Sequence, residues 1–156
     1  MSPISETPET QTYSPSDLEP YLINSKPEGA LPVAEAIKKA KPGEPIVVKG
    51  QIAAAMTPFS ENYASFVIGD EALLYCNEMG DDHCPTPWDA CCEDLDKVKT
   101  SRASVQIVEN GLPLPLSLKG IGGLKELDYV VVSGTADPSS TPDNLIINLT
   151  EIYRGQ

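Results

Sequence analysis

The chain has 156 residues, a hydrophobic fraction of 40% and a formal net charge of -12. This length favours a single domain with one core, and the longest apolar runs are far too short for a membrane-spanning helix. Only 11 basic residues stand against 23 acidic ones, so the average field repels polyanions and we expect no nucleic-acid partner. Met1 is followed by polar residues and prolines rather than by a basic end and an apolar run, so the chain as given is expected to be soluble and to open without a signal peptide.

Residues 1–30 are rich in Pro, Ser, Thr and Glu. Prolines interrupt helices, and such a composition buries too little apolar surface to offset the entropy of ordering. We therefore predict a flexible tail over residues 1–30 and one folded domain over residues 31–156. A few apolar residues of the tail are candidates for local docking on that domain: Leu18, Tyr21, Leu22 and Ile23.

A short helix is predicted after the tail. Pro32 suits a first-turn position, and Pro42-Gly43 ends the segment. Four apolar residues fall on one face at helical spacing: Val33, Ala36, Ile37 and Ala40.

The rest of the chain predicts strands separated by turns. The expected strands are residues 46–55, 63–68, 71–76, 103–109, 112–118, 128–135 and 144–153. Asn110-Gly111 is typical of a tight hairpin, and the glycine-rich residues 120–127 predict a turn with one helical turn. Five or so strands in meander order, with a helical turn before the last two, predict an all-β fold with one short helix. The expected architecture is a small OB-fold-like β-barrel, with an open two-sheet sandwich as the alternative.

A cysteine-rich insertion is predicted over residues 76–101. Its first part, from position 76 to 92, reads CNEMGDDHCPTPWDACC and holds all four cysteines, the one His and the one Trp of the chain. Core formation does not explain this clustering. Acidic residues also crowd the segment, in a pattern that does not fit a calcium-binding loop and is typical of a solvated charged surface.

Two disulfides are the first explanation of the cysteines. A bond between the neighbours Cys91 and Cys92 is strained, so Cys76 and Cys84 would each bond to one member of that pair. Closing a loop of this size contributes roughly 3 kcal/mol in the chain-entropy account, and it requires an oxidising compartment.

A metal site is the second explanation. Zinc could be held by Cys76, Cys84, Cys91 and Cys92, or by three of them with His83. The spacing matches no standard pair of zinc-binding turns, whereas Cu(I) needs only two or three thiolates. Free, partly buried thiols are the third explanation.

The insertion also contains the one His and the one Trp of the chain, and each has a simpler interpretation than the cysteines. His83 is expected to be a solvated loop residue, because no second imidazole exists to join it. Trp88 is expected to anchor the loop on the barrel, with stacking on a bound ligand as its functional alternative. His83 is the one His that could act as a base, and its sequence neighbour Cys84 is poorly placed to be its nucleophile. The sequence also contains no phosphate-binding glycine loop. We therefore identify no catalytic residue and expect no enzyme.

The segment CPTPWDACC, residues 84–92, resembles the C-x-T-P-W-D-x-C-C signature of an uncharacterised bacterial family with an OB-like domain. The similarity extends over about residues 33–153 and includes Val48-Lys49-Gly50 and Ser104-Val105-Gln106. Members of that family are often exported lipoproteins. The resemblance therefore implies a cell-envelope location, a possible lipid anchor in an unprocessed precursor, and disulfides rather than metal.

These observations together predict a non-enzymatic binding or interaction module of the bacterial cell envelope. Its partner is an unknown protein or small ligand, its recognition surface is the loop from Cys76 to Cys92, and no cofactor is required. A zinc- or copper-binding protein is one alternative. A nucleic-acid-binding OB-fold is another, which the acidity disfavours.

Overall fold

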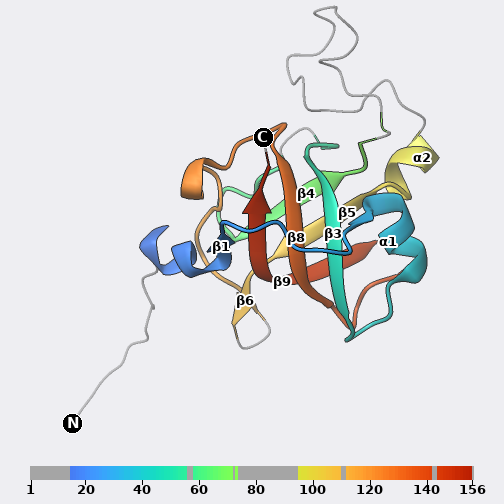
Figure 1. Ribbon diagram of the computed structural model, residues 1–156, viewed down its shortest axis with the longest axis horizontal. Coiled ribbons are helices and arrows are strands. Elements are labelled where there is room, and N and C mark those ends of the chain that lie inside the picture. The colour runs from blue at the N-terminus through green and yellow to red at the C-terminus, as the bar shows by residue number, and fades with distance from the viewer. Residues whose placement is uncertain are drawn as a thin grey trace, which may run out of the picture.

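A computed structural model of the chain describes residues 15–55, 58–71, 73, 95–109, 112–141 and 144–155. Among these residues, seven of the nine strands belong to one sheet, and the other two form a separate hairpin. Five strands of this sheet close on themselves into a barrel (Figure 1): β3 (Pro45–Ile52), β4 (Ser65–Gly69), β5 (Arg102–Gln106), β8 (Tyr129–Ala136) and β9 (Leu145–Arg154).

The strand order of the barrel is that of an OB-fold. β3 pairs antiparallel with β4, and β4 pairs antiparallel with β5. β5 then pairs parallel with β9, β9 pairs antiparallel with β8, and β8 returns to β3. The prediction of an OB-fold-like all-β barrel is thus confirmed, and the sandwich alternative is wrong because the sheet has closed. The simple meander order is also wrong, since β5 neighbours β9 rather than β8.

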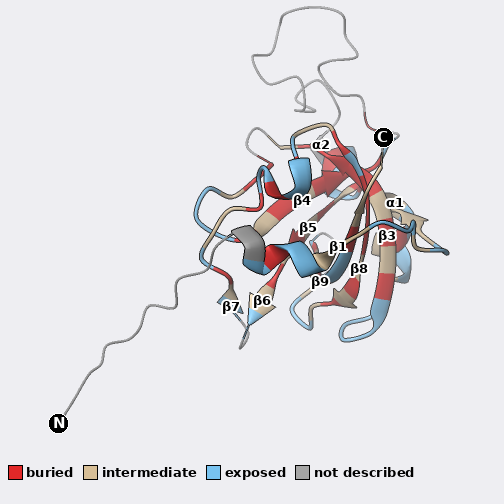
Figure 2. Ribbon diagram, turned by 60° about the vertical axis from the view of Figure 1, so that its left-hand side comes forward, coloured by how far each residue is buried: buried red, intermediate tan, exposed pale blue. Residues whose placement is uncertain are grey.

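Alternation along the strands fills the barrel interior. In β5, for example, Ala103 and Val105 are buried whereas Ser104 and Gln106 lie on the outer face. Figure 2 shows the same alternation of buried and partly exposed residues along β3. The largest fully buried side chains of the barrel cluster are Phe66, Leu18, Ile52, Ile68, Ile107, Leu124, Leu145, Ile147, Val33 and Val48.

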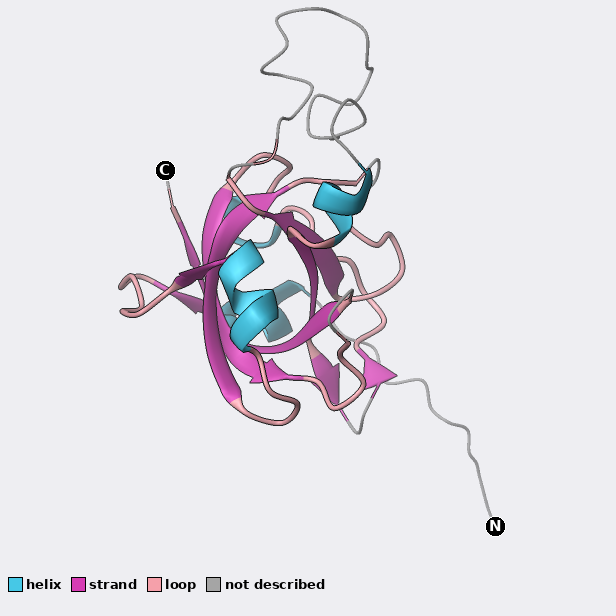
Figure 3. Cartoon of the chain, turned by 90° about the vertical axis from the view of Figure 1, so that its right-hand side faces the viewer, coloured by secondary structure: helices cyan, strands magenta, loops and turns pink. Residues whose placement is uncertain are grey.

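Helix α1 (Val33–Lys39) covers one end of the barrel, as the view into that end shows (Figure 3). Val33 and Ala36 are fully buried. The backbone N–H of Ala34 donates to Oδ2 of Asp70 at 2.9 Å, so a carboxylate from the end of β4 satisfies one of the free donors of the first helical turn. Gly50 lets the helix approach, because a Cβ there would lie 2.9 Å from Cγ2 of Val33.

Two short 3-10 helices close the barrel on the other side: η1 (Pro15–Tyr21) and η3 (Ile121–Gly123). Leu18 of η1 is 1% exposed and joins Ile121 and Leu124 in the main core. η3 is the helical turn predicted in the glycine-rich segment.

From residue 15 on, the N-terminal segment docks on the barrel, as expected for Leu18, Tyr21, Leu22 and Ile23. β1 (Leu22–Ile23) pairs parallel with β9, and β2 (Leu31–Pro32) pairs parallel with β3. Between them, residues 24–30 cross the outer face of β9, β8 and β3 (Figure 1); we call this crossing segment the strap. The folded part of the chain thus reaches back to residue 15, because β1 hydrogen-bonds an otherwise open edge of β9 and Leu18 fills the barrel end. Residues 1–14 lie outside the described part of the chain.

The connection from β4 to β5 contains the predicted insertion. Residues 71 and 73 are not in a strand, while 72 and 74–76 lie outside the described residues, so the strand expected over 71–76 is not found in the described residues of that range. A short helix that the sequence did not reveal, α2 (Leu95–Lys99), precedes β5. After β5, the expected hairpin is present as β6 (Val108–Glu109) paired antiparallel with β7 (Leu112–Pro113). No helix among the described residues is long and apolar enough to cross a membrane.

Candidate functional site

The residues singled out from the sequence lie outside the described part of the chain. They are Cys76, His83, Cys84, Trp88, Cys91 and Cys92. The disulfide, zinc, copper and Trp88 hypotheses therefore remain predictions. Among the described residues, no group of three or more His, Cys, Asp or Glu side chains is placed to hold a metal ion.

The structure does define the stem from which the insertion leaves the barrel. The backbone N–H of Asp70 donates to the carbonyl oxygen of Ser101 at 2.8 Å, which brings together the two ends of the β4–β5 connection that contains the insertion. Leu73 on the outgoing side and Val98 on the returning side are buried in a small second cluster with Ala53 and Ala54. The insertion therefore starts and finishes at one fixed place beside helix α1.

This stem covers part of the surface that OB-folds commonly use. In many such proteins the outer faces of the second and third barrel strands bind oligonucleotides or oligosaccharides, and these strands are β4 and β5 here. Val67, on the outer face of β4, packs against the second cluster. Arg102, at the start of β5, donates from Nη1 to the carbonyl oxygen of Ala54 at 3.3 Å. A ligand site is better sought elsewhere on the barrel.

A groove with a volume of about 600 Å³ lies at the α1 end of the barrel. Three parts of the chain frame it: helix α1 with the turn that follows it, the returning stem of the insertion, and the connection from β8 to β9. Its lining consists of Ala34, Ile37, Lys38, Ala40, Pro42, Thr100, Ser101, Ser140, Thr141 and Leu145. We call it the α1 groove.

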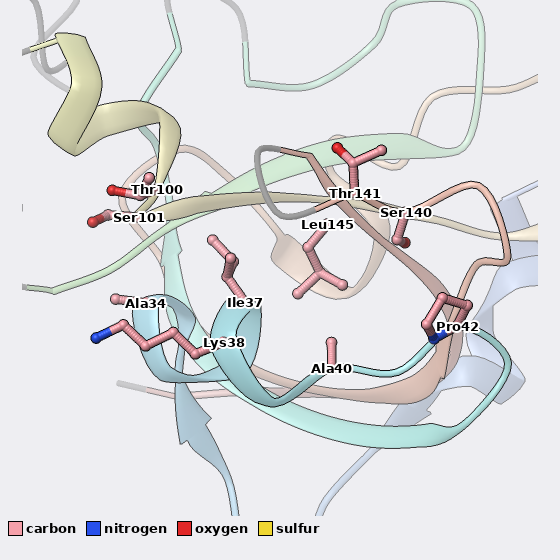
Figure 4. A pocket seen from close by; sticks show the side chains of 10 residues that line it. All are labelled: Ala34, Ile37, Lys38, Ala40, Pro42, Thr100, Ser101, Ser140, Thr141 and Leu145. Carbon is pink, nitrogen blue, oxygen red and sulfur yellow. The ribbon is translucent and has the colours of Figure 1, made fainter.

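Apolar side chains form the middle of the α1 groove and hydroxyls its two ends. In Figure 4, Ile37 from α1 and Leu145 from β9 point toward each other across the space. Thr100 and Ser101 stand at one end, and Ser140 and Thr141 at the other. This arrangement suits a compact, mainly apolar ligand with polar groups at its extremities.

Internal hydrogen bonds hold two of these hydroxyls in place. Oγ1 of Thr100 donates to the carbonyl oxygens of Asp96 at 3.1 Å and Lys97 at 3.3 Å. Oγ of Ser140 accepts from the backbone N–H of Ile146 at 3.0 Å and donates to its carbonyl oxygen at 3.1 Å. Both hydroxyls keep an oxygen lone pair for a ligand donor.

A polar chain fixes the β8–β9 connection that carries Ser140. Nε2 of Gln106 donates to Oδ1 of Asn148 at 2.9 Å, and Nδ2 of Asn148 donates to Oδ1 of Asp137 at 2.9 Å. Hydrogen bonds from the Ser139 hydroxyl, Asn148 and the Ser139 backbone hold the pKa of Asp137 below its ordinary value. The groove wall is thus tied to the parallel pair of β5 and β9.

The sequence analysis missed the α1 groove, although its signal was present. The four apolar residues predicted for one helical face separate in the structure: Val33 and Ala36 are fully buried, whereas Ile37 and Ala40 are only half-buried. The apolar face of this helix is wider than the part that packs on the barrel. Such an excess of apolar surface indicates a second contact. The other walls come from loops that no periodicity reveals.

Comparisons with protein-family models, with curated protein sequences and with solved structures give no match. The class of the protein therefore follows from its fold and its grooves alone. It is an OB-fold-like barrel whose β4–β5 connection carries a cysteine-rich insertion beside a ligand-sized groove.

Proposed function

We propose that this chain is a non-enzymatic binding module that takes a compact, mainly apolar ligand in the α1 groove. The observation that carries the proposal is the groove itself: about 600 Å³ between Ile37 and Leu145, with hydroxyls at both ends. That volume falls within the range of small-molecule sites, and such sites combine an apolar lining with a few placed polar groups.

The position of the groove supports a role for the insertion in recognition. Thr100 and Ser101 line the groove and also belong to the returning stem. A ligand in the groove would therefore touch the base of the insertion, so the loop from Cys76 to Cys92 is proposed as the second part of the recognition surface. Among the described residues of the lining, Lys38 is the one with a charged side chain, and it would favour a ligand with an anionic group at one end.

The test uses the fluorescent probe 8-anilino-1-naphthalenesulfonate, which has apolar rings and one negative charge. We expect the full-length protein to bind it and Ala40→Trp, which fills the groove, to bind at least about tenfold more weakly, a loss of about 1.4 kcal/mol. Glu35→Trp is the matched control, because Glu35 is exposed and lies outside the groove lining. Unchanged affinity in a folded Ala40→Trp variant would refute the proposal.

A location in the bacterial cell envelope is part of the same proposal. It is supported by the resemblance of residues 84–92 to exported lipoproteins and by the clustering of four cysteines, which suits an oxidising compartment. Intact mass after alkylation without reduction tests it. Absence of alkylation supports two disulfides, whereas four alkylated thiols would contradict them, and elemental analysis of the same sample would then test for zinc or copper.

A further inference from the structure

A second groove crosses the outer face of β3, β8 and β9, on the side of the sheet that the strap spans. Its volume is about 430 Å³. The lining combines strap, sheet, C-terminus and outgoing stem: Lys26, Lys49, Gly50, Glu71, Tyr129, Val130, Val131, Tyr153 and Gly155. It shares no lining residue with the α1 groove.

Strand register places the main side chains of this groove in two neighbouring rows. Lys49 of β3 is opposite Val131 of β8, which is opposite Tyr153 of β9. In the next row on the same face, Tyr129 of β8 is opposite Gln51 of β3. Alternate residues of a strand point to the same face, so both tyrosines and Lys49 project from one surface.

The tyrosines offer accessible aromatic surface on a fixed backbone. Tyr129 is 42% exposed, which is unusual for a large apolar side chain here. Its carbonyl oxygen accepts a hydrogen bond from the backbone N–H of Gly155 at 2.6 Å, so the end of the chain is held against β8.

The charged side chains of this groove are mainly positive, although the whole protein is negatively charged. Lys26 from the strap and Lys49 from β3 face one acidic residue, Glu71, whereas the chain carries a net charge of -12. Among the described residues of the lining, the excess is one positive charge. A ligand with one negative charge is therefore attracted, while a polyanion is repelled by the rest of the surface.

We propose that this groove binds a sugar ring that carries a single carboxylate. The apolar face of the ring packs on Tyr129 and Tyr153, the carboxylate pairs with Lys49 and Lys26, and Glu71 accepts hydrogen bonds from ring hydroxyls. A sugar ring has an apolar C–H face and polar hydroxyl groups. The aromatic surface suits the first, and the polar side chains beside it suit the second. This site is additional to the α1 groove and does not depend on it.

The experiment compares methyl β-D-glucuronide with methyl β-D-glucoside, which lacks only the charge, by backbone amide NMR of the full-length protein. We expect the glucuronide, at concentrations up to about 20 mM, to shift the amides of Gly50, Val131 and Gly155. The glucoside should bind roughly two- to fivefold more weakly, the range of one exposed ion pair. Equal binding of the two sugars, or no shift at these amides, would overturn the proposal.

Variants assign the contacts. Tyr129→Ala should weaken glucuronide binding roughly three- to tenfold, and Lys49→Gln should remove the preference over the glucoside. The matched controls are Tyr63→Ala, at a tyrosine 52% exposed outside this groove, and Lys99→Gln on α2; both should bind as the parent does. A ten-nucleotide oligo-dT that binds the same amides more tightly than the glucuronide would overturn the proposal in favour of single-stranded nucleic acid.

Discussion

The two ends of the barrel are closed in different ways. At the η1 and η3 end, Leu18, Ile121 and Leu124 pack so tightly that the cavity left among them has a volume of only about 10 Å³. At the α1 end, the small residue Ala36 of the helix is buried in the main core, and a groove of about 600 Å³ remains beside the helix. Large apolar side chains complete a core, whereas a short helix with small residues covers the barrel and leaves room for a ligand.

The largest expected effect is at the tight end. Leu18→Ala should lower the free energy of unfolding by about 2–5 kcal/mol, because it empties a fully buried site in the main core. Urea unfolding of the full-length protein measures the change. A loss below about 0.5 kcal/mol would mean that η1 is not part of the folded domain.

An ion-pair cluster also secures the tight end. Oδ1 of Asp128 accepts from Nζ of Lys125 at 2.7 Å, and Oδ2 accepts from Nε of Arg154 at 2.7 Å. Burial raises the pKa of the Asp128 carboxyl, but these hydrogen bonds, with one from the Lys125 backbone, outweigh it and hold the pKa below the ordinary 3.8. Asp128→Asn should therefore cost about 1–2 kcal/mol at pH 7.

The same cluster predicts a pH dependence. The pKa of the Asp128 carboxyl is lower in the folded state than in the unfolded state. Its contribution to stability is therefore complete above the pKa of the unfolded state and is lost as the pH falls through the pKa of the folded state. The parent protein should lose this contribution below roughly pH 5, and Asp128→Asn should show a shallower loss. Urea unfolding at pH 7 and pH 3 measures both slopes; parallel slopes would show that Asp128 is not the responsible group.

At the open end, the carboxylate of Asp70 holds the first turn of α1. Asp70→Ala should lower the free energy of unfolding by about 1 kcal/mol, the usual effect of losing a helix cap, and should weaken probe binding in the α1 groove. Asp96→Ala, at an exposed position on α2, is the control. Hydrogen exchange of the Ala34 and Ala40 amides reports whether the helix loosens; unchanged exchange would contradict the role given to Asp70.

The smallest expected effect is that of Ile37→Ala. Ile37 is half-buried beside the α1 groove, so its truncation should cost less than about 1 kcal/mol, in contrast to Leu18→Ala. Probe affinity should nevertheless fall, because the groove loses one wall. Equal stability losses for Leu18→Ala and Ile37→Ala would remove the distinction between the two ends.

The barrel was predictable from the sequence because alternation, hairpin residues and the glycine-rich turn each report local structure. Strands β8 and β9 and the hairpin of β6 and β7 were found in this way. The parallel pairing of β5 with β9 was not, because it joins residues about 40 positions apart in the chain, such as Ala103 and Leu145. Local periodicity carries no information on such pairs.

The N-terminal segment was predicted only in part, as a tail with a few docking residues, and the grooves were not predicted at all. Composition alone made residues 15–30 look like a tail, yet Leu18 and the two-residue strands β1 and β2 dock on surfaces that exist only once the barrel has closed. The α1 groove likewise brings together Ile37 of helix α1 with Ser101 and Ser140 of two distant loops. The four clustered cysteines, with His83 and Trp88, were visible in the sequence, but all six residues lie outside the described part of the chain.

The central claim is that the α1 end binds a ligand and the η1 and η3 end does not. One titration tests it directly: methyl NMR of the full-length protein with 8-anilino-1-naphthalenesulfonate, reading both ends in the same spectrum. We predict progressive, saturable shifts of the Ile37 and Leu145 methyls and none for those of Leu18 and Ile121. Equal shifts at both ends, or shifts confined to Leu18 and Ile121, would contradict the account.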